Sequence, residues 1–200
     1  MKKKLFFLLS IYFLCFNNLI AVTYNSEPKI FIQELVDDAI KTLDDKSLTV
    51  EEKNNIIRKI ALENVDINAL GLYTLGKIRK DLEDDTLNKY QELFESYFLK
   101  SLISRLTDYS SQKFEVVDAE QKSANYTIVK SKIAESDKSP EITIDWRVYT
   151  KNPQKPLIRD LIVEGLSLAR TQKEEFASIL NSNDNNISAL IKKLEEFISS

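Results

Sequence analysis

Histidine is absent from all 200 residues, and the chain has only one cysteine, three glycines and four prolines. Without histidine there is no Ser-His-Asp or Cys-His catalytic set and no histidine-ligated zinc site. The three glycines, Gly71, Gly76 and Gly165, form no phosphate-binding loop. The acidic stretch 81–85 lacks the ligand spacing of a calcium loop. We therefore expect neither a cofactor nor a metal, and catalysis that depends on histidine is excluded.

The balance of charge also limits the possible partners of the protein. Lysine and arginine number 28 against 31 acidic residues, which gives a net charge of −3 and a pI near 5.3. Proteins that bind nucleic-acid phosphates are normally basic, so we expect no nucleic-acid partner. The hydrophobic fraction of 43% and the charged fraction of 30% are typical of one folded domain with a substantial core.

The first 21 residues have the pattern of a signal peptide. Three lysines at positions 2–4 precede an apolar run over 5–16, which is too short to cross a bilayer as a helix. Cleavage after Ala21 removes three basic residues, no acidic residue and the only cysteine, Cys15, so residues 22–200 carry a charge of −6 and no disulfide. These properties suit a bacterial periplasm. An uncleaved anchor is the alternative, because Leu19 is a poor residue three positions before the cut.

Hydrophobic periodicity divides the remaining chain into helices followed by strands. Apolar residues at three- and four-residue steps predict helices starting at Pro28, after a capping box at Thr49–Glu52, near Ile67 and at Asp84, the last running to about Tyr109. The period then changes to two, predicting strands over 114–117, 126–134, 142–149 and 157–163, before helices over 168–180 and 187–198. We predict one α+β domain, with helices packed on one face of a curved, mainly antiparallel four-stranded sheet.

The helix from Asp84 carries a wide aromatic stripe, which is the candidate ligand surface. Such a stripe usually forms core, but against a curved sheet it can also enclose an apolar cavity. In the cavity hypothesis the helix and the sheet face each other through Phe94, Phe98 and Leu102 on one side and Ile144, Trp146 and Ile162 on the other.

Two groups of carboxylates are the only candidates for catalysis. Asp145 and Arg147 share the polar face of one strand, and Asp160 and Glu164 flank an apolar segment. Surface ion pairs explain both groups more simply, the second with Arg159 or Arg170. An enzyme would need one of the aspartates buried with a raised pKa. An interaction module with a filled core is a further alternative.

Several segments resemble one known family, in order and at matching spacing. They are Leu75-Gly76, Tyr90 to Phe94, Tyr97-Phe98, Phe114 to Val117, Ile144-Asp145-Trp146-Arg147, Phe176 and Leu190 to Leu194. The most specific segment is Ile158 to Leu168, with its Asp-x-x-x-Glu-Gly-x-Ser pattern. The chain thereby resembles the MlaC family, also called the toluene-tolerance family. It departs from the family at Arg79, where an aromatic is usual, at 82–84, where Ala-Thr-Pro is usual, and at Leu166, where valine is usual.

The resemblance implies a monomeric periplasmic phospholipid carrier. Its partners would be an inner-membrane ABC transporter ring and an outer-membrane lipoprotein–porin complex, and its role the maintenance of outer-membrane lipid asymmetry. By resemblance the bend at Gly165 borders the lipid cavity, which adds Leu166 to the expected site. The expected lipid-binding residues are Leu75, Phe94, Phe98, Leu102, Ile144, Trp146, Ile162 and Leu166.

Export gives the first testable prediction. Protein recovered from the periplasmic fraction of an expressing bacterium should begin near residue 22, because the basic start and short apolar run direct secretion and cleavage. N-terminal sequencing measures this. A protein that still begins at Met1 and sediments with membranes would contradict it.

Overall fold

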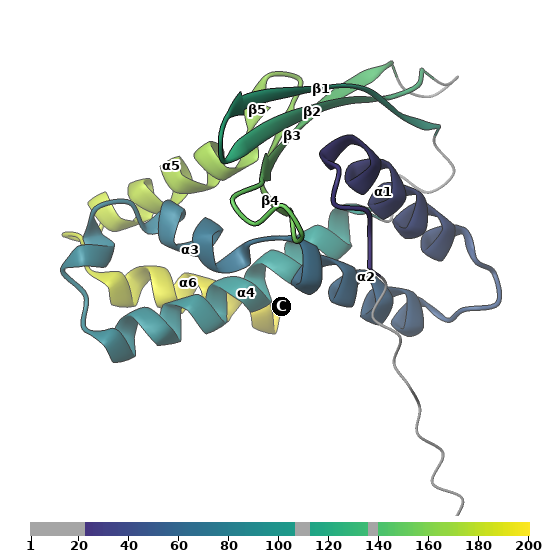
Figure 1. Ribbon diagram of the computed structural model, residues 1–200. Helices are drawn as coiled ribbons and strands as arrows, with labels where there is room; N and C mark the ends of the chain where they lie inside the picture. Colours follow the sequence, from purple (N-terminus) through teal and green to yellow (C-terminus); the bar gives the residue numbers. More distant parts are fainter. Residues whose placement is uncertain (1–22, 107–112, 136–139) are drawn as a thin grey trace, which may run out of the picture.

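A computed structural model describes residues 23–106, 113–135 and 140–200 (Figure 1). The predicted signal peptide and the predicted continuation of the long helix to about Tyr109 lie outside these ranges. Within them, no helix is both long and apolar enough to cross a membrane.

The first half of the described chain is helical, as predicted. Its elements are α1 (Pro28–Asp44), α2 (Val50–Asn64), α3 (Ile67–Leu75), the 3-10 turn η1 (Ile78–Lys80) and α4 (Asp84–Leu106). The capping box before α2 is confirmed. The Glu52 backbone N–H donates to Thr49 Oγ1 at 3.2 Å, and the Thr49 N–H donates to Glu52 Oε2 at 2.8 Å, so two backbone donors at the helix start are satisfied.

The second half forms an open, curled antiparallel sheet followed by two helices. The strands are β1 (Phe114–Ser123), β2 (Tyr126–Ile133), β3 (Ile142–Tyr149), β4 (Leu157–Val163) and β5 (Leu166–Ser167), and the helices are α5 (Leu168–Asn181) and α6 (Ile187–Ser199). The strands lie in sequence order from β1 to β5. The predicted α+β class is confirmed, with a fifth, two-residue strand that hydrophobic periodicity is too coarse to detect.

Buried side chains gather in two separate cores. The helical core joins α2, α3, α4, α5 and α6 through residues such as Leu70, Tyr90 and Phe176. The sheet core joins α1 and α2 to one face of the sheet, and it includes Phe31 and Val129. We call the face of the sheet that carries this core the inner face. Figure 1 shows α1 beneath the β1–β2 end of the sheet and α3, α4 and α6 as a layer farther below.

The turn after β4 gives a structural reason for the Asp-x-x-x-Glu-Gly-x-Ser pattern of the sequence. Glu164 and Gly165 have φ angles of 48° and 80°, so a two-residue loop with both residues left-handed joins β4 to β5. Gly165 suits this conformation because it has no Cβ. The buried Asp160 accepts hydrogen bonds from Ser167 Oγ at 2.6 Å and from the Ala169 backbone N–H at 3.0 Å. These contacts fix β5 and the first turn of α5 against β4.

A second polar contact ties the helices to the sheet. The Arg159 guanidinium lies 3.4 Å from the ring centroid of Tyr149 and donates to Asp66 Oδ2 and to the Tyr126 hydroxyl. Asp66 lies between α2 and α3, and its backbone N–H donates to the Ile158 carbonyl at 2.9 Å. The α2–α3 junction is therefore held on β4.

The environment of Asp160 predicts a stability difference. Asp160→Ala leaves the Ser167 hydroxyl and the Ala169 backbone N–H without their acceptor. The substitution should therefore lower the free energy of unfolding by about 2 kcal/mol. Asp145→Ala, on the same face of the sheet in the neighbouring strand, is the matched control and should change it by less than about 0.5 kcal/mol. Urea unfolding of the purified protein measures both. Equal losses in the two variants would refute the assigned role of Asp160.

Candidate functional site

An apolar row crosses the inner face of the sheet from β1 to β5. Cross-strand pairing aligns Val116, Ser131, Ile144, Val163 and Leu166, and paired residues point to the same side of an antiparallel sheet. Val116 and Ser131 are buried, Ile144 and Val163 are half-buried, and Leu166 is 68% exposed. Exposure rises toward β5 because α1 packs on β1 and β2.

A neighbouring row adds the only tryptophan of the chain. Trp146 pairs with Val129 on one side and with Leu161 on the other. The indole Nε1 donates to Ser131 Oγ at 2.8 Å, and that hydroxyl donates to the Ile144 carbonyl at 2.9 Å. The one polar atom of the Trp146 side chain thus has its hydrogen bond within the sheet, and the indole ring contributes apolar surface. We call Ile144, Trp146, Leu161, Val163 and Leu166 the inner strip.

The C-terminal half of α4 faces both cores. Phe98 and Leu102 are half-buried against the helical core, whereas Ile103 and Leu106 are half-buried against the sheet core, as are Trp146 and Leu161. This end of α4 therefore lies between the helical core and the sheet core. Incompletely buried apolar side chains from α4, β3 and β4 occur together here, which is the arrangement of an apolar binding surface.

The structure places the sequence-predicted residues in three environments. Leu75 and Phe94 are buried in the helical core, at 4% and 3% exposure. Phe98 and Leu102 lie at the edge of that core, and Ile144, Trp146 and Leu166 lie on the inner strip.

The expected position of Ile162 is wrong. It pairs with Asp145, so its side chain lies on the face opposite to Ile144 and Trp146. The cause is a bulge at Arg159: Ile158 pairs with Val148, but Asp160 pairs with Arg147, so one extra residue reverses the alternation. Leu161 and Val163 take the inner positions instead. The sequence did not predict these two residues, because a strand with regular alternation would place Leu161 and Val163 on the face opposite to the inner face.

Two hollows of the described surface lie away from the inner strip. One, of about 550 Å³, is formed by Tyr73, Gly76, Lys77, Arg79, Lys80 and Lys173. The other, of about 430 Å³, is formed by Thr23, Tyr24, Glu34, Asp37, Asp38 and Lys41. Neither lies between α4 and the sheet, where the sequence predicts an apolar cavity.

Two of the carboxylates singled out by the sequence, Asp160 and Glu164, have structural partners. The Asp160 side chain is 2% exposed and accepts hydrogen bonds from Ser167 and from the start of α5, and Arg147 Nη1 lies 3.9 Å from its Oδ2. Glu164 accepts from the backbone N–H and the hydroxyl of Thr143, which hold the pKa of its carboxyl below the ordinary value. No cluster of three potential metal ligands occurs among the described residues.

Comparison with known proteins identifies the family. No curated protein matches the chain. The solved structure of a phospholipid-binding protein from Ralstonia solanacearum, in complex with a phospholipid, is similar with a TM-score of 0.72 and 18% identity, covering 88% of this chain and 97% of that one. At this identity the likeness shows a shared fold. The family model described as MlaC protein matches residues 33–196, and the chain therefore belongs to the MlaC family.

Proposed function

We propose that this protein is a phospholipid carrier that holds acyl chains against the inner strip. Membership of the MlaC family and the phospholipid complex of the Ralstonia protein support this assignment. The observation that carries it is the graded exposure of the inner strip, from half-buried Ile144 to Leu166 at 68%. A core-forming row would be covered along its whole length. This row is left open at one end, where hydrocarbon can take the place of water.

The separation of the two cores provides a route for the ligand. Among their described members, Val65 is the one residue that packs against both cores. Acyl chains that enter beside β5 would spread along the inner strip and separate the C-terminal half of α4 from the sheet. Such a separation would leave the contacts of Phe98 and Leu102 with the helical core in place, and would break those of Ile103 and Leu106 with the sheet core.

The energetics suit a carrier that exchanges lipid. Burying an acyl chain of about 16 carbons contributes roughly 13 kcal/mol against water, at about 0.8 kcal/mol per CH₂. The bilayer offers the lipid a similarly apolar environment, so the net free energy of transfer is small. The protein thus retains lipid while in water and releases it at a membrane or to a membrane-bound partner. The head group can stay in solvent at the open end, which predicts weak head-group selectivity.

The proposal places the mature protein in the periplasm, between two membrane assemblies. An inner-membrane ABC transporter ring and an outer-membrane lipoprotein–porin complex are the partners that the family resemblance implies. The predicted signal peptide supports export. The side chains of the inner strip are all apolar, and the hydroxyl of Ser131, which pairs with Ile144, accepts a hydrogen bond from Trp146, which favours a carrier over an enzyme.

Purified protein should contain phospholipid. Organic extraction followed by mass spectrometry should recover phospholipid in a stoichiometric ratio, because the inner strip is covered only when lipid is bound. A protein without acyl-chain surface, purified from the same cells, is the control. Recovery of no more phospholipid than from this control would contradict the proposal.

A charge on the open end of the strip should remove the lipid without unfolding the protein. Leu166→Glu places a carboxylate where acyl chains lie, and a penalty of about 3 kcal/mol lowers lipid occupancy over a hundredfold. Leu62→Glu is the matched control, because Leu62 is 44% exposed on α2 and belongs to neither core. Circular dichroism should show both variants folded. Equal phospholipid content in the two variants would exclude Leu166 from the site.

A further inference from the structure

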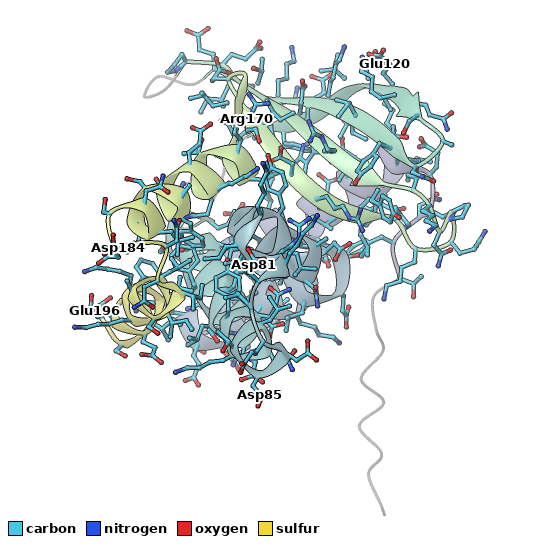
Figure 2. The ribbon with its side chains drawn as sticks, turned by 90° about the vertical axis from the view of Figure 1, so that its left-hand side faces the viewer. Asp81, Asp85, Glu120, Arg170, Asp184 and Glu196 are labelled. Carbon is cyan, nitrogen blue, oxygen red and sulfur yellow. The ribbon has the colours of Figure 1, made fainter. Side chains whose placement is uncertain are left out.

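A basic hollow lies at the end of α3, away from the inner strip. Tyr73, Gly76, Lys77, Arg79, Lys80 and Lys173 line its volume of about 550 Å³. The first five residues belong to α3, η1 and the turn between them, and Lys173 comes from α5. Figure 2 turns this side of the molecule toward the viewer, with Asp81, the residue after η1, near the middle of the view. None of the lining residues belongs to the inner strip.

The four cations of the hollow have no carboxylate partner. Nine ion pairs occur among the described residues, and none of them includes Lys77, Arg79, Lys80 or Lys173. The chain has more acidic than basic residues, so this lack of pairing is not due to a shortage of carboxylates. Asp81 follows η1 directly, but it does not line the hollow. Four positive charges around one concavity attract anions.

Two of the cations are held in place by neighbouring groups. Arg79 Nη1 donates to the carbonyls of Leu72 and Gly76, each at 2.9 Å, and so covers the negative end of α3. Lys173 Nζ lies 4.9 Å from the ring centroid of Tyr73. Tyr73 itself is 41% exposed at the rim. The hollow is therefore an ordered basic surface with an amphipathic aromatic residue beside it.

We propose that this hollow binds the phosphate of an anionic phospholipid head group at a membrane surface. Ammonium and guanidinium groups are the usual protein partners of phosphate. The volume suits one small group rather than a helix or strand of another protein. An exposed tyrosine beside basic residues is typical of a membrane–water interface.

The test is binding of the purified protein to vesicles. The triple variant Lys77→Ala/Lys80→Ala/Lys173→Ala removes three charges and leaves Arg79 to cap α3. Lys46→Ala/Lys151→Ala/Lys155→Ala is the matched control, with the same net charge and three exposed lysines elsewhere. Co-sedimentation compares phosphatidylcholine vesicles with vesicles that also contain phosphatidylglycerol. Each basic residue raises the affinity for an anionic surface about fivefold. The triple variant of the hollow, called the hollow variant below, should therefore bind these vesicles about a hundredfold more weakly.

Further measurements separate the possible anions. Wild-type protein and the control variant should bind the phosphatidylglycerol vesicles comparably, bind phosphatidylcholine weakly and release the vesicles at high salt. Equal losses in the two triple variants would overturn the proposal, because they would show a non-specific effect of net charge. Calorimetric binding of inorganic phosphate or poly-glutamate, without vesicle binding, would also overturn it in favour of a free anion or an acidic protein. The phospholipid that co-purifies with the hollow variant should be unchanged, so this proposal and lipid carriage can fail independently.

Discussion

The hydrogen bond between Asp160 and Ser167 determines where the sheet ends and where α5 begins. The carboxylate is buried, and both of its oxygens are engaged, by Ser167 Oγ at 2.6 Å and by the Ala169 N–H at 3.0 Å. Ser167 also caps α5 through the Arg170 N–H. The left-handed turn at Glu164 and Gly165 brings β5 back along β4. Leu166 is thereby held on the inner face, although most of its side chain is exposed.

Two cores rather than one give the fold its capacity to admit a ligand. The helical core is closed by aromatic contacts, such as the packing of Phe176 against Tyr90 and Phe94, and by the Tyr90–Thr74 hydroxyl contact at 2.8 Å. The sheet core is closed by α1 at the β1–β2 end and is less covered toward β5. A single continuous core would leave no apolar surface for acyl chains, whereas this division leaves the inner strip available.

Much of the fold follows from local sequence patterns. The Thr49–Glu52 capping box, the Pro28 helix start and the change from a helical to an alternating period at residue 113 each correspond to an observed boundary. Part of the site could also be predicted, because Ile144 and Trp146 alternate regularly along β3. Leu161 and Val163 could not, since the bulge at Arg159 depends on cross-strand pairing. The burial of Phe94 against Phe176 likewise depends on helix packing that periodicity along one helix does not contain.

The single tryptophan provides the most direct measurement of the central claim, that acyl chains lie on the inner strip. Trp146 is the only tryptophan in the chain and lies on the strip, where it pairs with Leu161, so its fluorescence reports from one position. Loading the protein with phospholipid brominated on its acyl chains should quench this emission strongly, because bromine quenches on contact. Unbrominated phospholipid should not quench it. Stoichiometric binding of the brominated lipid with unchanged tryptophan emission would contradict the account.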